Sequence, residues 1–163
     1  MSMIMQWDSA DAATAENVRS MDVEAFIQWL EDSDGRISFD VDKAWHAVHF
    51  TLTGEEWNPI GPFGEVVLGG EPFGEEIGYG PARWLSPEAV ANAARELVNL
   101  SPDEFAGRLD LSSMFDNNIY PEIWNRDPVD EQLVEYVVAG YTEIRDRFTE
   151  AAASGQGFVI SLQ

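Results

Sequence analysis

The stretch DVDKAWHAVHFTLTG, residues 40–54, predicts a helix that lies at the centre of the fold. Asp40 can cap its first turn, and Gly54 can end it in a left-handed conformation. Spacings of four, three and four residues place four apolar side chains on one stripe, namely Val41, Trp45, Val48 and Leu52. Because Ala44 and Phe50 border this stripe, the helix is apolar over most of its circumference and is expected to be largely buried.

A second helix and two short strands are predicted before this stretch. The helix has an apolar stripe made of Val23, Phe26, Ile27 and Leu30. Asp34-Gly35 supplies a turn, after which Ile37 and Phe39 alternate as a brief strand. A further short strand is predicted for residues 3–7.

Residues 54–81 contain eight of the thirteen glycines, together with four prolines. This density predicts a long structured loop, because interleaved aromatic residues argue against disorder. Inside the loop, Val66-Val67-Leu68 is β-branched and bounded by turn residues, which is typical of a buried strand. Residues 82–85 are the partner that we expect for it.

The second half of the chain reads as helices with clear start signals. Ser86-Pro87 and Ser101-Pro102 each place an N-cap before a proline at the first helical position, and Asp127-Pro128 is predicted to start the longest helix. That helix carries one apolar stripe, made of Leu133, Val137, Tyr141, Ile144 and Phe148. Gly155 and Gly157 end it, and residues 158–160 form a closing strand.

Short strands at the start, middle and end of the chain, with helices in blocks between them, indicate the α+β class. We therefore expect a single compact domain over residues 1–163, in which several helices pack with a small sheet of short strands. A length of 163 residues fits one domain and not two.

The chain is strongly acidic, with 30 Asp and Glu against 9 Lys and Arg and a formal net charge of -21. The acids are spread along the whole sequence, and hydrophobic residues still make up 45% of it, which favours a folded core over an acidic tail. Such a charge opposes binding to nucleic acids and to anionic membranes. We therefore expect neither as a partner.

Cysteine is absent, so disulfides, thiolate metal sites and thiol nucleophiles are excluded. The opening residues lack the basic start and apolar run of a signal peptide, and no stretch has the length of a membrane-spanning helix. The expected compartment is the cytoplasm, and no cofactor is predicted.

Two segments resemble ligand motifs only in part. Residues 32–37 look like a piece of a calcium loop, but Leu30 and Val41 stand where the first and last acidic ligands belong. The glycine spacing of residues 69–76 resembles a phosphate-binding loop, but two glutamates replace its lysine and hydroxyl residue. Neither segment is predicted to bind its motif's ligand.

The two histidines, His46 and His49, are three residues apart on the central helix. Both could reach one metal ion, but the sequence identifies no third ligand. The favoured state of His49 is a buried neutral imidazole that is hydrogen-bonded to a carbonyl or carboxylate. The alternative is a general base or an orienting donor at the edge of a pocket.

Arg83 is the basic residue that follows the glycine-rich section. Its guanidinium either pairs with Glu75 or Glu76 and fixes the loop, or it receives an anionic group. Pairing with the loop is the favoured interpretation in so acidic a chain.

Three segments resemble a known family. Residues 42–54 are similar to the Asp-Lys-x-Trp-x-x-Leu-His-Phe-x-Leu-Thr-Gly signature of the YfbM-like bacterial domain family of unknown function. Residues 67–70 leading into 78–87 resemble its second block, and residues 119–121 resemble its third. The resemblance covers roughly residues 37–124 and is less close over residues 1–20. It implies one compact α+β domain with the Trp45 and His49 helix at its centre, and it implies no established activity, substrate or cofactor.

If the glycine-rich loop covers the central helix, a small cleft is expected where Trp45, His49, Tyr79, Arg83 and Trp84 converge. Two functions follow. The first is a non-enzymatic binding protein, of inhibitor or regulatory type, whose acidic surface complements a basic protein partner. The second is an enzyme or small-ligand sensor that uses His49 and Arg83 in the cleft.

Overall fold

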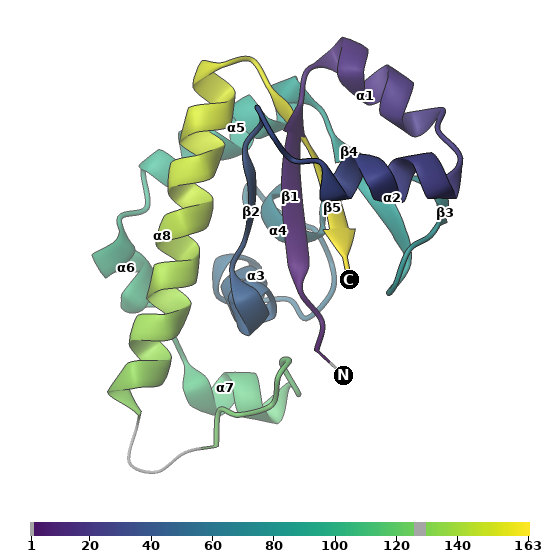
Figure 1. The fold of residues 1–163 in the computed structure, drawn as a ribbon. Coiled ribbons are helices and arrows are strands. Elements are labelled where there is room, and N and C mark those ends of the chain that lie inside the picture. Colours follow the sequence, from purple (N-terminus) through teal and green to yellow (C-terminus); the bar gives the residue numbers. More distant parts are fainter. Residues whose placement is uncertain (1, 126–129) are drawn as a thin grey trace.

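The computed structural model describes residues 2–125 and 130–163. Within them the chain folds around one five-stranded antiparallel sheet of order β2-β1-β5-β4-β3 (Figure 1). The strands are β1 (Met5–Ala10), β2 (Ser38–Asp40), β3 (Glu71–Glu76), β4 (Pro81–Leu85) and β5 (Gly157–Leu162). β1 and β5 lie side by side in the middle, so segments from opposite ends of the sequence form the centre of the sheet.

Helices cover both faces of this sheet. On one face lie α1 (Ala12–Arg19) and α2 (Val23–Glu31). Packed on the other face are α3 (Trp45–Thr53), α4 (Glu65–Leu68), α5 (Pro87–Val98) and α8 (Glu131–Ala153). The shorter helices are α6 (Pro102–Ala106), α7 (Leu111–Asp116) and a 3-10 turn at Asp42–Ala44. The predicted α+β class and the single compact domain are confirmed.

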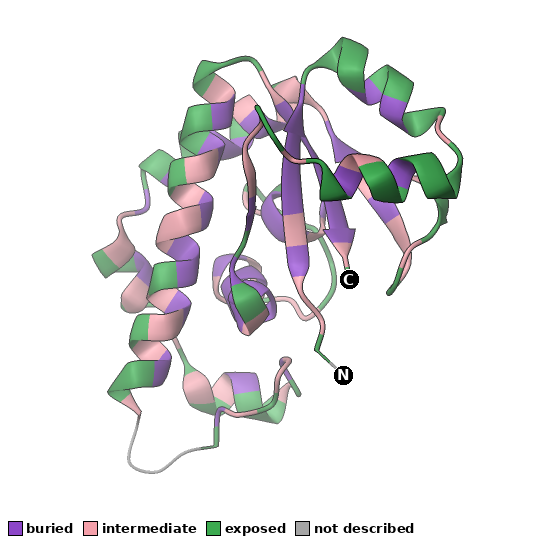
Figure 2. Ribbon diagram, viewed as in Figure 1, coloured by how far each residue is buried: buried purple, intermediate pink, exposed green. Residues whose placement is uncertain are grey.

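Strand alternation divides the interior into two cores. Phe158 and Ile160 of β5 face the larger core, which α3, α4, α5 and α8 complete. Val159 and Trp84 face the smaller core under α1 and α2. Figure 2 shows β1 and β5 as nearly continuous buried ribbon, since both faces of these two strands are covered.

The stripe predicted for the longest helix is confirmed, because all five of its residues are buried in α8. Gly140 of α8 lies so close to the 3-10 turn that an added Cβ would be 3.0 Å from the Cβ of Ala44. The predicted start at Asp127-Pro128 lies outside the described residues, which omit 126–129. The described helix begins at Glu131, and Asp130 caps it.

Other helix signals also hold. Ser86 and Ser101 cap α5 and α6, each with proline in the first turn, and Gly54 ends α3 with a φ of 75°. Asp40 does not cap α3: its carboxylate accepts from the backbone N–H of Asp42, and α3 begins only at Trp45.

The strand predicted for residues 66–68 is wrong, because these residues form the one-turn helix α4. Two side chains satisfy its carbonyls: the Trp7 indole donates to Val66 O at 3.0 Å and Arg83 donates to Val67 O at 3.1 Å. Tertiary hydrogen bonds therefore override the β-propensity of the two valines. The strand that pairs with β4 is instead β3, at 71–76, so the glycine-rich section is not a loop throughout.

Candidate functional site

Both ring nitrogens of His46 are hydrogen-bonded to backbone groups of the fold. His46 is 1% exposed, its Nε2–H donates to the carbonyl of Glu56 at 2.8 Å, and its Nδ1 accepts from the backbone N–H of Tyr120 at 2.9 Å. This pair of partners fixes the neutral tautomer. Burial lowers the pKa of His46 below its ordinary value.

His49 is also enclosed, with no exposed surface. Its Nδ1 makes no hydrogen bond to any described residue, and its Nε2 lies 3.4 Å from the hydroxyl of Thr53. Burial is the main reason why the pKa of His49 is lowered to about 4, and the neighbouring His46 and Arg83 lower it further. The predicted burial of His49 is confirmed, and the lowered pKa favours the neutral imidazole; a backbone contact with Asn58 acts on this pKa in the opposite direction.

Arg83 fixes the glycine-rich section, but not through an acid. Its guanidinium donates to the carbonyls of Gly69 at 2.6 Å and Val67 at 3.1 Å, which are the free carbonyls at the end of α4. Strand alternation points Arg83 toward the larger core, whereas Glu75 and Glu76 are exposed at the far end of β3. Burial lowers the pKa of Arg83 to about 10.

The structure places the five predicted cleft residues in three different environments. Trp45, His49 and Arg83 lie on the side of the larger core, where the Trp45 indole donates to Met3 O at 2.9 Å. Trp84 packs in the smaller core, on the opposite face of the sheet. Tyr79 is 41% exposed in the turn between β3 and β4. The five side chains are therefore not brought together in one cleft.

Tyr79 instead lines a groove between α2 and the hairpin that β3 and β4 form. Two pockets follow α2 from its first turn to its last, one of about 80 Å³ and one of about 550 Å³, and they share Ile77. We call this groove the α2–hairpin furrow. Its main apolar residues are Val23, Phe26, Ile27, Leu30, Ile77 and Tyr79.

The furrow combines exposed apolar surface with charge of one sign. Ile27 is 44% exposed and Val23 is 36% exposed, although both sit on the apolar stripe of α2. The charged side chains among its described lining residues are Asp22, Glu31 and Glu75, with no Lys, Arg or His. A furrow of this composition favours an apolar side chain that has cationic neighbours.

Local backbone structure holds the hairpin wall in place. The N–H of Tyr79 donates to Leu162 O at 3.1 Å, so the turn is attached to the end of β5. Gly78 has a φ of 105°, and an added Cβ would lie 2.9 Å from Leu162 O. Phe73 packs edge-on against Phe26 at 5.5 Å and joins the hairpin to α2. The turn sequence around Gly78 is thus required by a close backbone approach.

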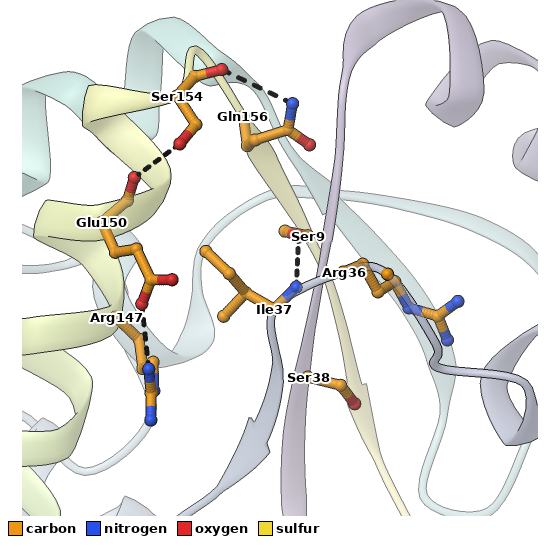
Figure 3. Close-up of a pocket in the computed structure, with 9 residues that line it drawn as sticks. Ser9, Arg36, Ile37, Ser38, Arg147, Glu150, Ser154 and Gln156 are labelled. Atoms are coloured by element: carbon orange, nitrogen blue, oxygen red, sulfur yellow. Dashed lines mark hydrogen bonds and ion pairs between the residues drawn. The ribbon is translucent and has the colours of Figure 1, made fainter.

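A larger pocket of about 610 Å³ lies between α8 and the start of β2 (Figure 3). Its two arginines are already paired. Arg147 binds Glu143 and Glu150 at 2.9 Å, while Arg36 turns away from α8 in Figure 3 and binds the buried Asp8 at 3.0 Å. The pocket therefore presents little uncompensated charge to a ligand.

Metal clusters and membrane-spanning helices are both lacking in the described part of the chain. No three His, Asp or Glu side chains among residues 2–125 and 130–163 are grouped so that they could hold a metal ion. Likewise, no helix in these segments is long and apolar enough to cross a membrane.

The apolar stripe of α2 indicates core positions, but only part of it is core. Phe26 and Leu30 are indeed buried, whereas Val23 and Ile27 share their stripe and stay exposed. The sequence signal for this exposed apolar surface is the width of the stripe, because a nine-residue helix at the sheet surface buries only part of it. The opposite wall has no signal of its own, because the sequence pattern does not predict β3.

Fold and site together define a small α+β protein with a helix-and-hairpin furrow on its surface. The family model described as "Domain of unknown function (DUF1877)" matches residues 1–161, so the chain belongs to this family. A similar solved structure is the crystal structure of YfbM from Escherichia coli, a protein of unknown function. It has 18% sequence identity and a TM-score of 0.74, over 98% of this chain and 99% of that chain. At this identity the likeness supports the YfbM-like fold alone. No curated protein matches the chain.

Proposed function

We propose that this protein is a non-enzymatic binding protein for a basic protein partner, and that the α2–hairpin furrow is its contact site. The carrying observation is the furrow itself, in which exposed Ile27 and Tyr79 lie beside acidic side chains and no basic one among the described lining residues. Apolar anchors give a protein interface its affinity, and the surrounding charge directs the approach of the partner.

The alternative, an enzyme or small-ligand sensor built on His49 and Arg83, has less support. His49 has no exposed surface, and both ends of the Arg83 guanidinium bond to backbone carbonyls of the fold. A catalytic base or an anion-binding cation needs access to its ligand. Burial therefore favours a structural role for these two residues.

The test compares charge reversal in the furrow with the same reversal elsewhere. One variant carries Glu31→Lys and Glu75→Lys, and the matched control carries Glu96→Lys and Asp103→Lys on α5 and α6, so both have the same net charge. Each protein is immobilised and exposed at low ionic strength to an extract of its own organism, and bound proteins are identified by mass spectrometry.

We expect a basic protein that the wild type and the control retain, that the furrow variant loses, and that rising salt releases. Equal capture by the furrow variant and the control would mean that the net charge, and not the furrow, attracts basic proteins. That outcome, or the capture of no basic protein, would contradict the proposed function.

A further inference from the structure

We infer that the partner presents a cationic amphipathic helix to the α2–hairpin furrow and does not add a strand to the sheet. This inference rests on the proposed function and specifies the shape of the basic segment. It depends on the course of the furrow along α2 and on the blocked outer edge of β3, neither of which the proposed function uses.

The two pockets of the furrow together run along a helix. The furrow follows all of α2, whose nine residues span about 13 Å. Val23, Ile27 and Glu31 recur every four residues along its wall, which is one ridge of a helix surface. A second helix packs on such a ridge with side chains at spacings of three and four, whereas a strand would present its side chains with a period of two.

The outer edge of β3 is closed to strand addition. Ile4 and Gln163 exchange two hydrogen bonds, at 2.7 and 2.9 Å, which fixes the alternation of bonded pairs across the sheet. When this alternation is followed through β5 and β4 to β3, the Pro72–Arg83 pair is a non-hydrogen-bonded pair. The backbone nitrogen of Pro72, which has no N–H, therefore faces the open edge of the sheet. The register is also irregular between Phe73 and Glu76.

A bound segment must also satisfy its own backbone. Burying unpaired N–H and C=O groups against apolar side chains such as Ile27 and Ile77 is costly. An extended segment would need backbone hydrogen bonds to the edge of β3, where Pro72 has no N–H to donate. A helix satisfies its own N–H and C=O groups internally. Lys or Arg on the flanks of that helix would reach Glu31 at one end of the furrow and Glu75 at the other.

The probes are two Leu/Lys peptides of about 18 residues, or five helical turns, with identical composition. In one, Leu follows the i, i+3, i+4, i+7 pattern of one helical face, which favours an amphipathic helix; in the other, Leu and Lys alternate, which favours a strand. Binding is measured by calorimetry in about 0.15 M salt, where surface charges are partly screened. Far-UV circular dichroism reports the peptide conformation.

We expect the helical-period peptide to bind about tenfold more tightly than the alternating peptide and to gain helicity when bound. Ile27→Gln removes apolar contact from the furrow and should weaken that binding about tenfold. Val98→Gln is the matched control, because Val98 is a 52% exposed residue of α5, and it should leave binding unchanged.

The outcomes separate this inference from the proposed function. If both peptides bind equally and this binding is lost when the charges of Glu31 and Glu75 are reversed, the inference of a helical partner is overturned. The basic-partner site then remains supported. Binding that is indifferent to Ile27→Gln and to the reversal of Glu31 and Glu75 would contradict both. Tighter binding of the alternating peptide would indicate strand addition and overturn the inference directly.

Discussion

His46 and His49 are one turn apart, buried to the same degree, and yet differently satisfied. His46 has a partner on each ring nitrogen, whereas Nδ1 of His49 has none among the described residues. An unsatisfied buried polar atom costs free energy, and an apolar side chain of similar size avoids that cost. The two histidines therefore predict opposite responses to the same substitution.

We expect His49→Leu to leave the free energy of unfolding at pH 7 unchanged or raised, and to flatten its dependence on pH. The pKa of His49 is about 4 in the folded protein, against an ordinary value of 6.5, so between these values the unfolded chain binds the proton more strongly. Wild-type stability from this group is complete above pH 6.5 and is lost as the pH falls toward 4. The loss is on the order of 3 kcal/mol.

Urea denaturation from about pH 4 to pH 7.5 measures this difference between wild type and variant. The contrasting variant is His46→Leu, which removes two hydrogen bonds and should be less stable than wild type at pH 7. Parallel pH profiles for wild type and His49→Leu would show that His49 does not titrate as its burial requires.

Among the structural elements, those with strong local signals were predictable and those fixed by distant side chains were not. Ser86-Pro87 and Ser101-Pro102 define α5 and α6 locally, through an N-cap followed by a fixed φ. The one-turn helix α4 depends on donors from Trp7 and Arg83, far away in sequence. β3 could not be predicted because its glycine, proline and three glutamates are typical of a turn.

The same edge composition makes β3 a protected edge, and Pro72 is the residue to change. We expect Pro72→Val to supply an outward N–H and to promote edge-to-edge association of the protein. Sedimentation velocity in about 0.5 M salt, where charge repulsion is screened, measures the change. Pro62→Val is the control, since Pro62 is exposed outside any strand, and it should remain at the wild-type size. An unchanged sedimentation coefficient for Pro72→Val would contradict the protective role.

For the whole molecule, the formal charge of -21 has a consequence for stability. Most of the acids are exposed, and their mutual repulsion opposes the compact state. We expect the free energy of unfolding to rise as sodium chloride increases from about 0.01 M to 0.1 M, because the Debye length falls from about 30 Å to 10 Å. Urea denaturation at each salt concentration measures the slope.

A variant with fewer charges supplies the comparison. Four exposed glutamates on separate elements are neutralised together: Glu24→Gln, Glu71→Gln, Glu96→Gln and Glu135→Gln. The variant should be more stable at low salt and should gain less from added salt. An equal slope for both proteins would attribute the salt effect to something other than repulsion among the acids.

The candidate site could be anticipated only in part at this scale. The acidic composition and Tyr79 are visible in the sequence as features of interest, but the furrow exists because α2 and the β3–β4 hairpin meet across the sheet. About fifty residues separate these walls in sequence. Local sequence patterns do not predict this contact, because it depends on the order of the strands in the sheet.

The central position of β1 and β5 also determines when the sheet can form during translation. Met5 pairs with Leu162, so the middle of the sheet waits until nearly all of the described chain has been translated. At about 5–20 residues per second, that wait is roughly 8–30 s after β1 has been made. During this interval β1 can meet β2 but has no neighbour on its other side. Newborn chains are therefore expected to depend on chaperones during translation more than the stability of the finished fold would indicate.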